Sequence, residues 1–182
     1  LVGARTPEVR ARAEEVFAVL GVEAVPLTPE EAELAKLMTN AWRYVKFAAA
    51  NQFWIMANNA GLDFSRIQDA LSHNYPRAAD MPGAGFAAGP CLLKDTMQLA
   101  AFANTSGPRG HSAMLVNEGL PFYIVEHLER QYDLAELTVG ILGMAFKGGS
   151  DDIRSSLSYK LRRILMFRVA RVLCTDPYVT GD

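Results

Sequence analysis

The longest stretch of the chain without an internal glycine or proline runs from Glu30 to Ala60. It follows Thr28-Pro29, where the threonine hydroxyl can cap a helix and proline suits the first turn. Acidic residues come next, where the helix dipole favours them. The pattern predicts one long helix over residues 29–60, and a fold built around it must be helical in its middle.

Two sets of side chains divide the surface of this predicted helix. Lys36 and Asn40 lie four residues apart and are therefore neighbours on one side. Alone they indicate a solvated face, but asparagine is a poor residue for a helix interior, so its place needs a reason. An apolar stripe on another side predicts a homodimer with the long helix at its centre. The stripe consists of Leu34, Leu37, Met38, Ala41, Trp42, Val45 and Ala49.

Alternating helix and strand patterns flank the long helix. Residues 7–20 have apolar side chains at helical spacing, and residues 22–27 alternate as in a short strand. Residues 137–146 are apolar almost throughout, as in a parallel strand buried on both faces, and residues 171–175 indicate the next strand. Such alternation is typical of α/β domains.

The expected fold class is therefore mixed α/β with a mainly α-helical central domain. We expect residues 1–28 to be the tail of one Rossmann-like domain, 29–133 the helical domain and 134–182 the start of a second Rossmann-like domain. Because both ends lie within such domains, we expect a piece of a longer polypeptide. Three shorter helices are predicted in the centre, over residues 65–72, 95–103 and 111–130, with a loop over 74–90 and a break at 105–108.

Composition narrows the class of protein. Half of the 182 residues are hydrophobic and 21% are charged, so we expect a packed core rather than disorder. The net charge of −2 argues against nucleic acid as a partner. No apolar run reaches the roughly 18 residues of a membrane helix, and we expect no membrane partner. Two distant cysteines, Cys91 and Cys174, fit a reducing compartment, so we expect a cytoplasmic protein.

One loop gathers residue types that support covalent catalysis. Glycines and alanines from residue 83 onward lead to Cys91, and Lys94 and Asp95 follow it. Helical spacing places Asp95 one turn beyond Cys91, on the same face. A thiolate nucleophile needs a cationic or helix N-terminal setting, and a carboxylate can activate water. A lone cysteine in such a segment is more often a small buried hydrophobe, so the residues alone leave both interpretations open.

Four segments resemble, in order, the motifs of one enzyme family. Residues 32–40 are similar to its Ala-Glu-x-x-Lys-x-x-x-Asn helix. Residues 83–95 resemble Gly-x-Gly-Phe-Gly-Gly-x-Cys-Leu-x-Lys-Asp, with two alanines in place of glycines and one added residue. Residues 117–121 resemble an Asn-x-x-x-Pro turn, and residues 146–156 resemble Phe-Lys-x-x-Thr-Asp-Asp-x-Arg-x-Ser. The chain thus resembles the UDP-glucose/GDP-mannose dehydrogenases, which are nucleotide-sugar dehydrogenases.

The resemblance implies oxidation of the C6 alcohol of a UDP-sugar to a carboxylate with two NAD. It implies that Cys91 forms a thiohemiacetal and then a thioester, and that Lys36 and Asn40 stabilise the oxyanion. Asp95 would orient or deprotonate the hydrolytic water. The implied NAD contacts are Lys94 and Arg154. The implied substrate contacts are Lys147, Phe146, Gly85 and Phe86, together with Arg77, which would reach the UDP-sugar of a partner subunit.

Two other classes of function stay open at this stage. The apolar stripe fits a non-catalytic helical dimerisation module. Cys91 also fits a cysteine-nucleophile hydrolase, for which His73 is the histidine nearest in sequence. No Gly-x-Gly-x-x-Gly segment is present, so we expect the chain alone to be inactive as a dehydrogenase. The histidines lack ligand spacing, and we expect no metal site.

Overall fold

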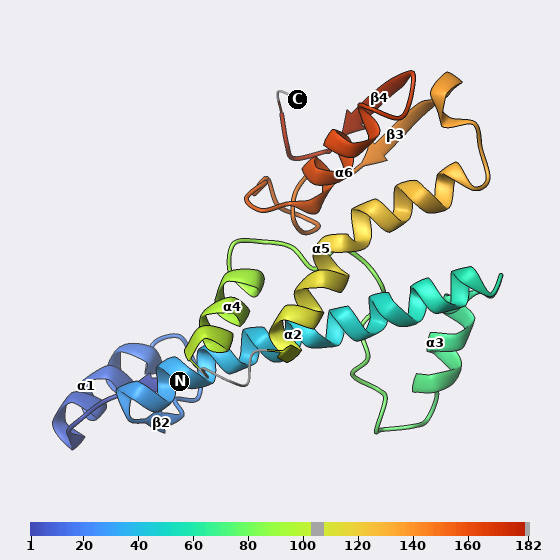
Figure 1. The fold of residues 1–182 in the computed structure, drawn as a ribbon. Coiled ribbons are helices and arrows are strands. Elements are labelled where there is room, and N and C mark those ends of the chain that lie inside the picture. The colour runs from blue at the N-terminus through green and yellow to red at the C-terminus, as the bar shows by residue number, and fades with distance from the viewer. Residues whose placement is uncertain (103–107, 181–182) are drawn as a thin grey trace.

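The computed structural model describes residues 1–102 and 108–180, and the long helix α2 (Pro29–Asn59) is its axis (Figure 1). The predicted start is confirmed, because Thr28 Oγ1 accepts the N–H of Glu31 at 3.2 Å while the Glu31 carboxylate accepts the N–H of Thr28 at 2.8 Å. Gly61 follows with a φ of +69°, which ends the helix. Among the described helices, none is both long and apolar enough to cross a membrane.

A small N-terminal unit lies at the start of α2 (Figure 1). Strands β1 (Val2–Gly3) and β2 (Pro26–Leu27) pair in parallel, and α1 (Pro7–Ala18) connects them. The strand predicted over residues 22–27 is therefore only two residues long. The apolar stripe of α1 has no cover within the described chain, because none of its residues is buried.

Three helices form the central part with α2. They are α3 (Phe64–Ser72), α4 (Leu92–Phe102) and α5 (Pro108–Glu129), and both α4 and α5 contact α2. Helix α4 begins three residues before the predicted start, and its predicted end at residue 103 lies outside the described residues, as does most of the predicted break. The central core consists of Tyr44, Ala48, Ala87, Leu92 and Ala113.

Helix α5 contains a proline in its interior. Residues 117–121 resemble a turn motif of the family, but they lie inside the helix predicted over 111–130, and the chain is helical through Pro121. Figure 1 shows α5 bent along its length. The bend has a simple cause, since proline has no N–H to donate to the carbonyl of Asn117 and its ring crowds the preceding turn. The bend lets α5 contact both α2 and α6 (Leu157–Leu165).

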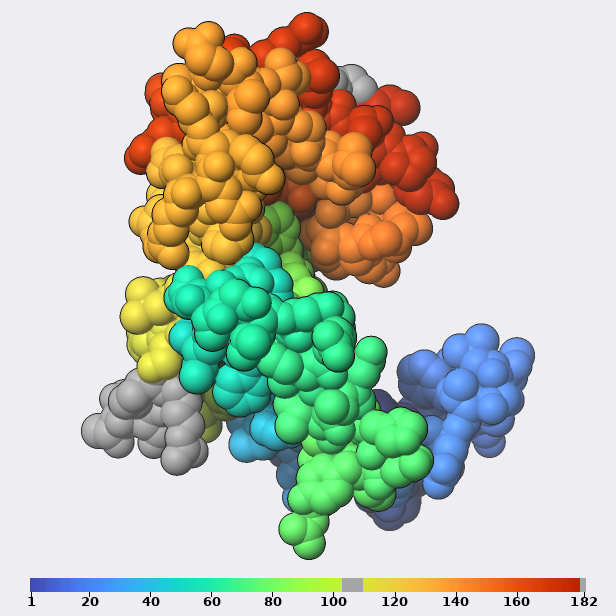
Figure 2. All heavy atoms as spheres, turned by 90° about the vertical axis from the view of Figure 1, so that its right-hand side faces the viewer, coloured from blue at the N-terminus to red at the C-terminus, as the bar shows by residue number. Residues whose placement is uncertain are grey.

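A second small α/β unit follows α5. Strands β3 (Thr138–Leu142) and β4 (Arg171–Thr175) pair in parallel after a 3-10 turn, η1 (Leu134–Glu136), and α6 joins them. Figure 2 shows this unit stacked on the central helices, with the N-terminal unit at one side. The expectation that β3 is buried on both faces is wrong for the described chain, because Leu142 is 86% exposed. The core consists of Val125, Leu134, Ile141, Met144 and Leu165.

Candidate active site

One face of α2 carries the residues that meet the rest of the central part. These residues follow one another at helical spacing, and they are Lys36, Asn40, Tyr44, Ala48 and Asn51. The apolar stripe predicted from the sequence points elsewhere, because Met38 is 51% exposed and Trp42 is 58% exposed. The face toward α4 and α5 is therefore the partly polar one.

Asp95 in the first turn of α4 is the centre of a charged cluster on this face. Its side chain is only 1% exposed. Lys36 Nζ donates to Asp95 Oδ2 at 2.5 Å, and Asn40 Nδ2 donates to the same oxygen at 2.6 Å. Lys94 Nζ lies 3.4 Å from Oδ1, which accepts no hydrogen bond from the described residues. One carboxylate oxygen is thus saturated, and the other is buried and available. We call Lys36, Asn40, Lys94 and Asp95 the charged cluster.

The charged cluster keeps Asp95 ionised. Burial raises the pKa of the Asp95 carboxyl, but hydrogen bonds from Lys36 and Asn40 outweigh burial, so its pKa lies below the usual 3.8. The hydrogen bond to Asp95 raises the pKa of Lys36 in turn. Asp95 is buried while Lys36 is half-exposed, and an ion pair that takes a carboxylate out of water contributes little net stability compared with apolar packing. An ion pair such as that of Lys36 and Asp95, close to a cysteine that can serve as a nucleophile, is therefore typical of a functional site.

Cys91 lies at the N-terminus of α4, within range of two cations. It is an exposed free thiol, and its carbonyl accepts the N–H of Asp95 at 2.9 Å, so the two residues are one helical turn apart as predicted. Electrostatic interaction with Cys91 contributes to the raised pKa of both Lys36 and Arg154. The fold thus brings the sulfur, the carboxylate and the donors of α2 to one place.

The C-terminal unit closes onto the loop before Cys91. Gly89 has a φ of +102°, and a Cβ built there would lie 2.8 Å from the ring of Phe146, so only glycine fits. The N–H of Gly89 also donates to the carbonyl of Ser155 at 3.5 Å. Two segments that were singled out separately in the sequence, residues 83–95 and 146–156, are therefore in contact.

The other predicted binding residues fall into two groups. Lys147 is exposed beside the Phe146 ring, with Nζ 5.7 Å from the ring centre. Arg154 pairs with Asp152 through two nitrogens, at 2.9 and 2.6 Å, and these bonds lower the pKa of Asp152 to about 2. Arg77 is exposed in the long loop and is not a partner of Asp95, so the fold does not bring it to the cluster within one chain.

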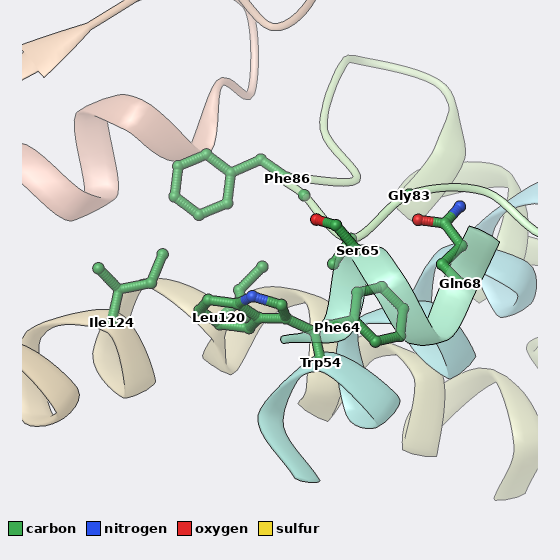
Figure 3. Close-up of a pocket in the computed structure, with 10 residues that line it drawn as sticks. Trp54, Phe64, Ser65, Gln68, Gly83, Phe86, Leu120 and Ile124 are labelled. Carbon is green, nitrogen blue, oxygen red and sulfur yellow. The ribbon is translucent and has the colours of Figure 1, made fainter. Parts of the chain in front are cut away.

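Gly85 and Phe86 border a cavity of about 450 Å³ between the loop, α2, α3 and α5. Figure 3 shows Phe86 on one side of this cavity and Trp54, Leu120 and Ile124 on the other. The sequence patterns did not identify Trp54, because an aromatic residue in a long helix is usually part of a core.

Two functional candidates were also missed. Asn51 and Asn117 are completely buried, and Asn51 Nδ2 donates to Asn117 Oδ1 at 2.9 Å. The only signal in the sequence was a second asparagine on the Lys36–Asn40 face of α2, where asparagine again has low helix propensity. Asn117 was noted as part of a motif, but no role followed from it.

Comparison with known proteins gives a consistent result. Residues 30–118 match the model of the UDP-glucose/GDP-mannose dehydrogenase family, central domain. Residues 140–182 match the model of the same family's UDP binding domain. The two matches cover the charged cluster, the Cys91 loop and the segment that packs on it.

The curated relatives are dehydrogenases of UDP-sugars by name. A UDP-N-acetyl-D-mannosamine dehydrogenase from Pyrococcus horikoshii is 35% identical over 82% of this chain and 37% of its own length. The UDP-glucose 6-dehydrogenase AglM from Haloferax volcanii is 32% identical over 100% of this chain and 44% of its own length. The chain thus spans less than half the length of these relatives.

Solved structures agree with the fold. A UDP-glucose dehydrogenase from Pyrobaculum islandicum superposes with a TM-score of 0.84 at 32% identity, over 96% of this chain and 42% of that one. The P. horikoshii UDP-ManNAc dehydrogenase gives 0.83 at 30% identity, over 99% of this chain and 45% of that one. Motifs, family models and fold therefore agree that this chain belongs to the UDP-glucose/GDP-mannose dehydrogenase family of nucleotide-sugar dehydrogenases.

Proposed function

We propose that the chain is the catalytic centre and part of the UDP-binding domain of a longer, NAD-dependent UDP-sugar 6-dehydrogenase. The observation that supports this most is Asp95, buried and ionised, with Oδ2 held by Lys36 and Asn40, while Oδ1 accepts no hydrogen bond from the described residues and lies 3.4 Å from the Lys94 ammonium. A purely structural carboxylate would have both oxygens satisfied. Cys91, exposed one helical turn away, supplies the nucleophile.

The residues suggest a division of labour during oxidation of the C6 aldehyde. The Cys91 thiolate attacks the carbonyl carbon and forms a C–S bond, while the carbonyl oxygen becomes an oxyanion. Lys36 and Asn40 are the nearby donors for that oxyanion, and such donors contribute about 3 to 4 kcal/mol each in other enzymes. Loss of a hydride from the thiohemiacetal carbon gives a thioester.

Hydrolysis of the thioester assigns a second role to Asp95. Its Oδ1, which accepts no hydrogen bond from the described residues, can accept a proton from a water molecule as that water attacks the thioester carbon. The C–S bond then breaks, the Cys91 thiolate leaves, and the carboxylate product is released. The lowered pKa keeps Asp95 ionised for this step at neutral pH.

Lys94 and Arg154 carry positive charges that complement the negatively charged phosphates of NAD. Lys94 and Arg154 are cations with side chains 65% and 71% exposed, and Arg154 is within electrostatic range of Cys91. NAD, when bound, would accept the two hydrides released in the reaction. A dinucleotide-binding segment is absent from the sequence of residues 1–182, and we propose that another part of the complete polypeptide provides it.

Substrate binding follows from the UDP binding domain match. Lys147 beside Phe146 would hold the anionic UDP end, and Gly85 and Phe86 would line the path to Cys91. Arg77 would reach the UDP-sugar of a partner subunit, because within one chain it lies away from the charged cluster.

We propose that residues 1–28 are the tail of one Rossmann-like domain, 29–133 the helical central domain and 134–182 the start of a second Rossmann-like domain, and that the enzyme is a homodimer. The support for the dimer is the exposed stripe of α2 that includes Met38 and Trp42. Sedimentation of the complete polypeptide should show a dimer at micromolar concentration, and a stable monomer would contradict it. The two free thiols, Cys91 and Cys174, support a cytoplasmic location.

The open alternatives have less support. A cysteine hydrolase needs a histidine base, but the ring of His73 contacts Asn74 and is not part of the charged cluster. A simple dimerisation module does not explain why the buried Asp95 carboxylate has one oxygen that accepts no hydrogen bond from the described residues.

The function is tested with the purified complete polypeptide and NAD. It should form two NADH for each uronic acid released from a UDP-sugar, with UDP-glucose and UDP-N-acetyl-mannosamine as first substrates. No NADH with any UDP-sugar would overturn the proposal. One NADH per sugar, with aldehyde as the final product, would overturn the role of the thioester.

A further inference from the structure

Two completely buried asparagines connect three segments that are distant in sequence. Asn51 of α2 and Asn117 of α5 are both 0% exposed. Each lies on the inner side of its helix, and together they reach the loop that ends at Cys91. We call these two residues the buried amide pair.

The contact with the loop uses the backbone of Gly85 on both sides. The N–H of Gly85 donates to Asn51 Oδ1 at 2.8 Å, and Asn51 Nδ2 donates to the carbonyl of Gly85 at 2.9 Å. This is the pairing that a neighbouring β-strand would offer, here supplied by one side-chain amide. It fixes both the position and the orientation of the Gly85 backbone.

The second asparagine orients the first. The remaining N–H of Asn51 Nδ2 donates to Asn117 Oδ1 at 2.9 Å, and Asn117 Nδ2 donates to the carbonyl of Tyr44 at 3.0 Å. Asn51 has no freedom to rotate its amide without breaking buried hydrogen bonds, and a buried polar group left unsatisfied is destabilising. The amide is therefore held from α2 and α5 together.

The turn of α5 that carries Asn117 is also tied to the C-terminal unit. Lys160 of α6 donates to the carbonyl of Glu118 at 2.7 Å and lies 3.1 Å from its carboxylate. The bend at Pro121 lies in the next turn of α5. The motif of residues 117–121, which the proposed chemistry does not use, is thus the place where the loop, α2 and the C-terminal unit are joined.

The loop before Cys91 is consequently held at two points. The buried amide pair holds Gly85, and Phe146 with Ser155 holds Gly89. We propose that Asn51 and Asn117 are positioning residues that keep this loop in the arc that presents Cys91 to the charged cluster. This inference rests on the proposed function, since it names residues that act through Gly85 on the same site.

The test compares Asn51→Ala, Asn117→Ala and the double variant in the complete enzyme. Asn59→Ala is the matched control, because Asn59 is also in α2 but its side chain accepts hydrogen bonds from Tyr123 and Arg130 of α5 and the segment after it, instead of bonding Gly85. Hydrogen exchange is measured on a peptide covering residues 83–91 and on one from the middle of α2. Turnover with a UDP-sugar and binding of that sugar are measured alongside.

We expect exchange in residues 83–91 to become at least about fivefold faster in Asn51→Ala while the α2 peptide changes less. We expect kcat to fall about 10- to 100-fold, as for other small displacements of a reacting group. Asn117→Ala should give a smaller change in both. The double variant should be little worse than Asn51→Ala, because the two residues act as one unit.

Three results would overturn the proposal. The first is hydrogen exchange of residues 83–91 that is as slow in Asn51→Ala as in Asn59→Ala although the melting temperature of Asn51→Ala falls. That pattern indicates a merely structural role. Another is additive losses in the double variant. The third is normal kcat with a faster loop. If the unmodified enzyme shows no dehydrogenase activity, the proposed function fails, but the exchange arm still decides whether Asn51 and Asn117 hold the loop. If Asn51→Ala does not fold, Asn117→Ala carries the same comparison.

Discussion

Helix α2 presents two polar groups on one face, one toward α4 and the other toward α5 and the loop before Cys91, and the two groups differ in charge, burial and hydrogen bonding. The charged cluster near residue 36 contains a buried carboxylate, a half-exposed lysine and one unsatisfied oxygen. The buried amide pair near residue 51 is neutral, completely buried and hydrogen-bonded on every side that the contacts above describe. The two groups are about four helical turns apart on one face.

The difference shows how chemistry and positioning are separated along one helix. An unsatisfied buried oxygen costs stability, so it persists where a water or substrate is meant to occupy it. A satisfied amide network costs little and makes a single arrangement of the backbone favourable. The charged cluster therefore has the character of a reactive site, and the amide pair has the character of its support. Four experiments can break or sharpen this contrast.

The largest effect is expected for Cys91→Ser in the complete enzyme. A hydroxyl is a much weaker nucleophile than a thiolate, so conversion to the acid should fall on the order of a thousandfold or more. The fold should survive, because Cys91 is exposed and serine is similar in size. Cys174→Ser is the control, since Cys174 lies in β4 and packs in the C-terminal core. If Cys91→Ser still converted the UDP-sugar to the acid at the full rate, the interpretation of this site as reactive would be wrong.

The next largest effect is expected for Asp95→Asn. The amide keeps the shape but cannot accept a proton from water, so turnover should fall about 10²- to 10⁴-fold. Hydrolysis is the step affected, so a covalent sugar adduct should accumulate on Cys91 and be visible by mass spectrometry. A variant that is inactive yet carries no adduct would place Asp95 before thioester formation and contradict the assigned role.

A smaller effect is expected at the nucleotide end. Lys147→Ala and Arg154→Ala each remove an exposed cation. A charged hydrogen bond contributes about 1.5 to 3 kcal/mol, so the apparent dissociation constants of the ligands should rise about 10- to 100-fold. Melting temperatures should change little, because both residues are exposed. Lys147 should affect the UDP-sugar and Arg154 should affect NAD. Unchanged constants for both ligands would remove the assignment.

The smallest effect concerns acid stability. The pKa of Asp95 is lower in the folded chain than its usual 3.8, so its contribution to stability is present above about pH 4 and is lost as the pH falls through the folded value. The difference in melting temperature between the unmodified chain and Asp95→Asn should therefore shrink as the pH falls from 5 to 3. Asn51→Ala should lower stability equally at both values, because no charge is involved. If the loss of stability in Asn51→Ala also depended on pH, the distinction between the charged cluster and the buried amide pair would be contradicted.

The sequence alone determined the local features of this protein. The start and length of α2 follow from Thr28-Pro29 and from the absence of glycine and proline up to residue 60. The relation of Cys91 to Asp95 follows from helical spacing, and the C-terminal strand over residues 171–175 follows from its apolar run. All of these depend on hydrogen bonds and preferences between residues close in the chain, which a pattern can capture.

Only the tertiary structure decided which face of α2 is functional and what holds the Cys91 loop. Periodicity identified the stripe with Met38 and Trp42 because it registers apolarity, but these two residues are exposed in the single chain. The polar contacts that matter join residues 34, 55 and 66 positions apart, from Asn51 to Gly85, from Asn40 to Asp95 and from Asn51 to Asn117. A buried polar side chain is stable only when its partners are present, and those partners are set by how the helices pack rather than by their neighbours in sequence.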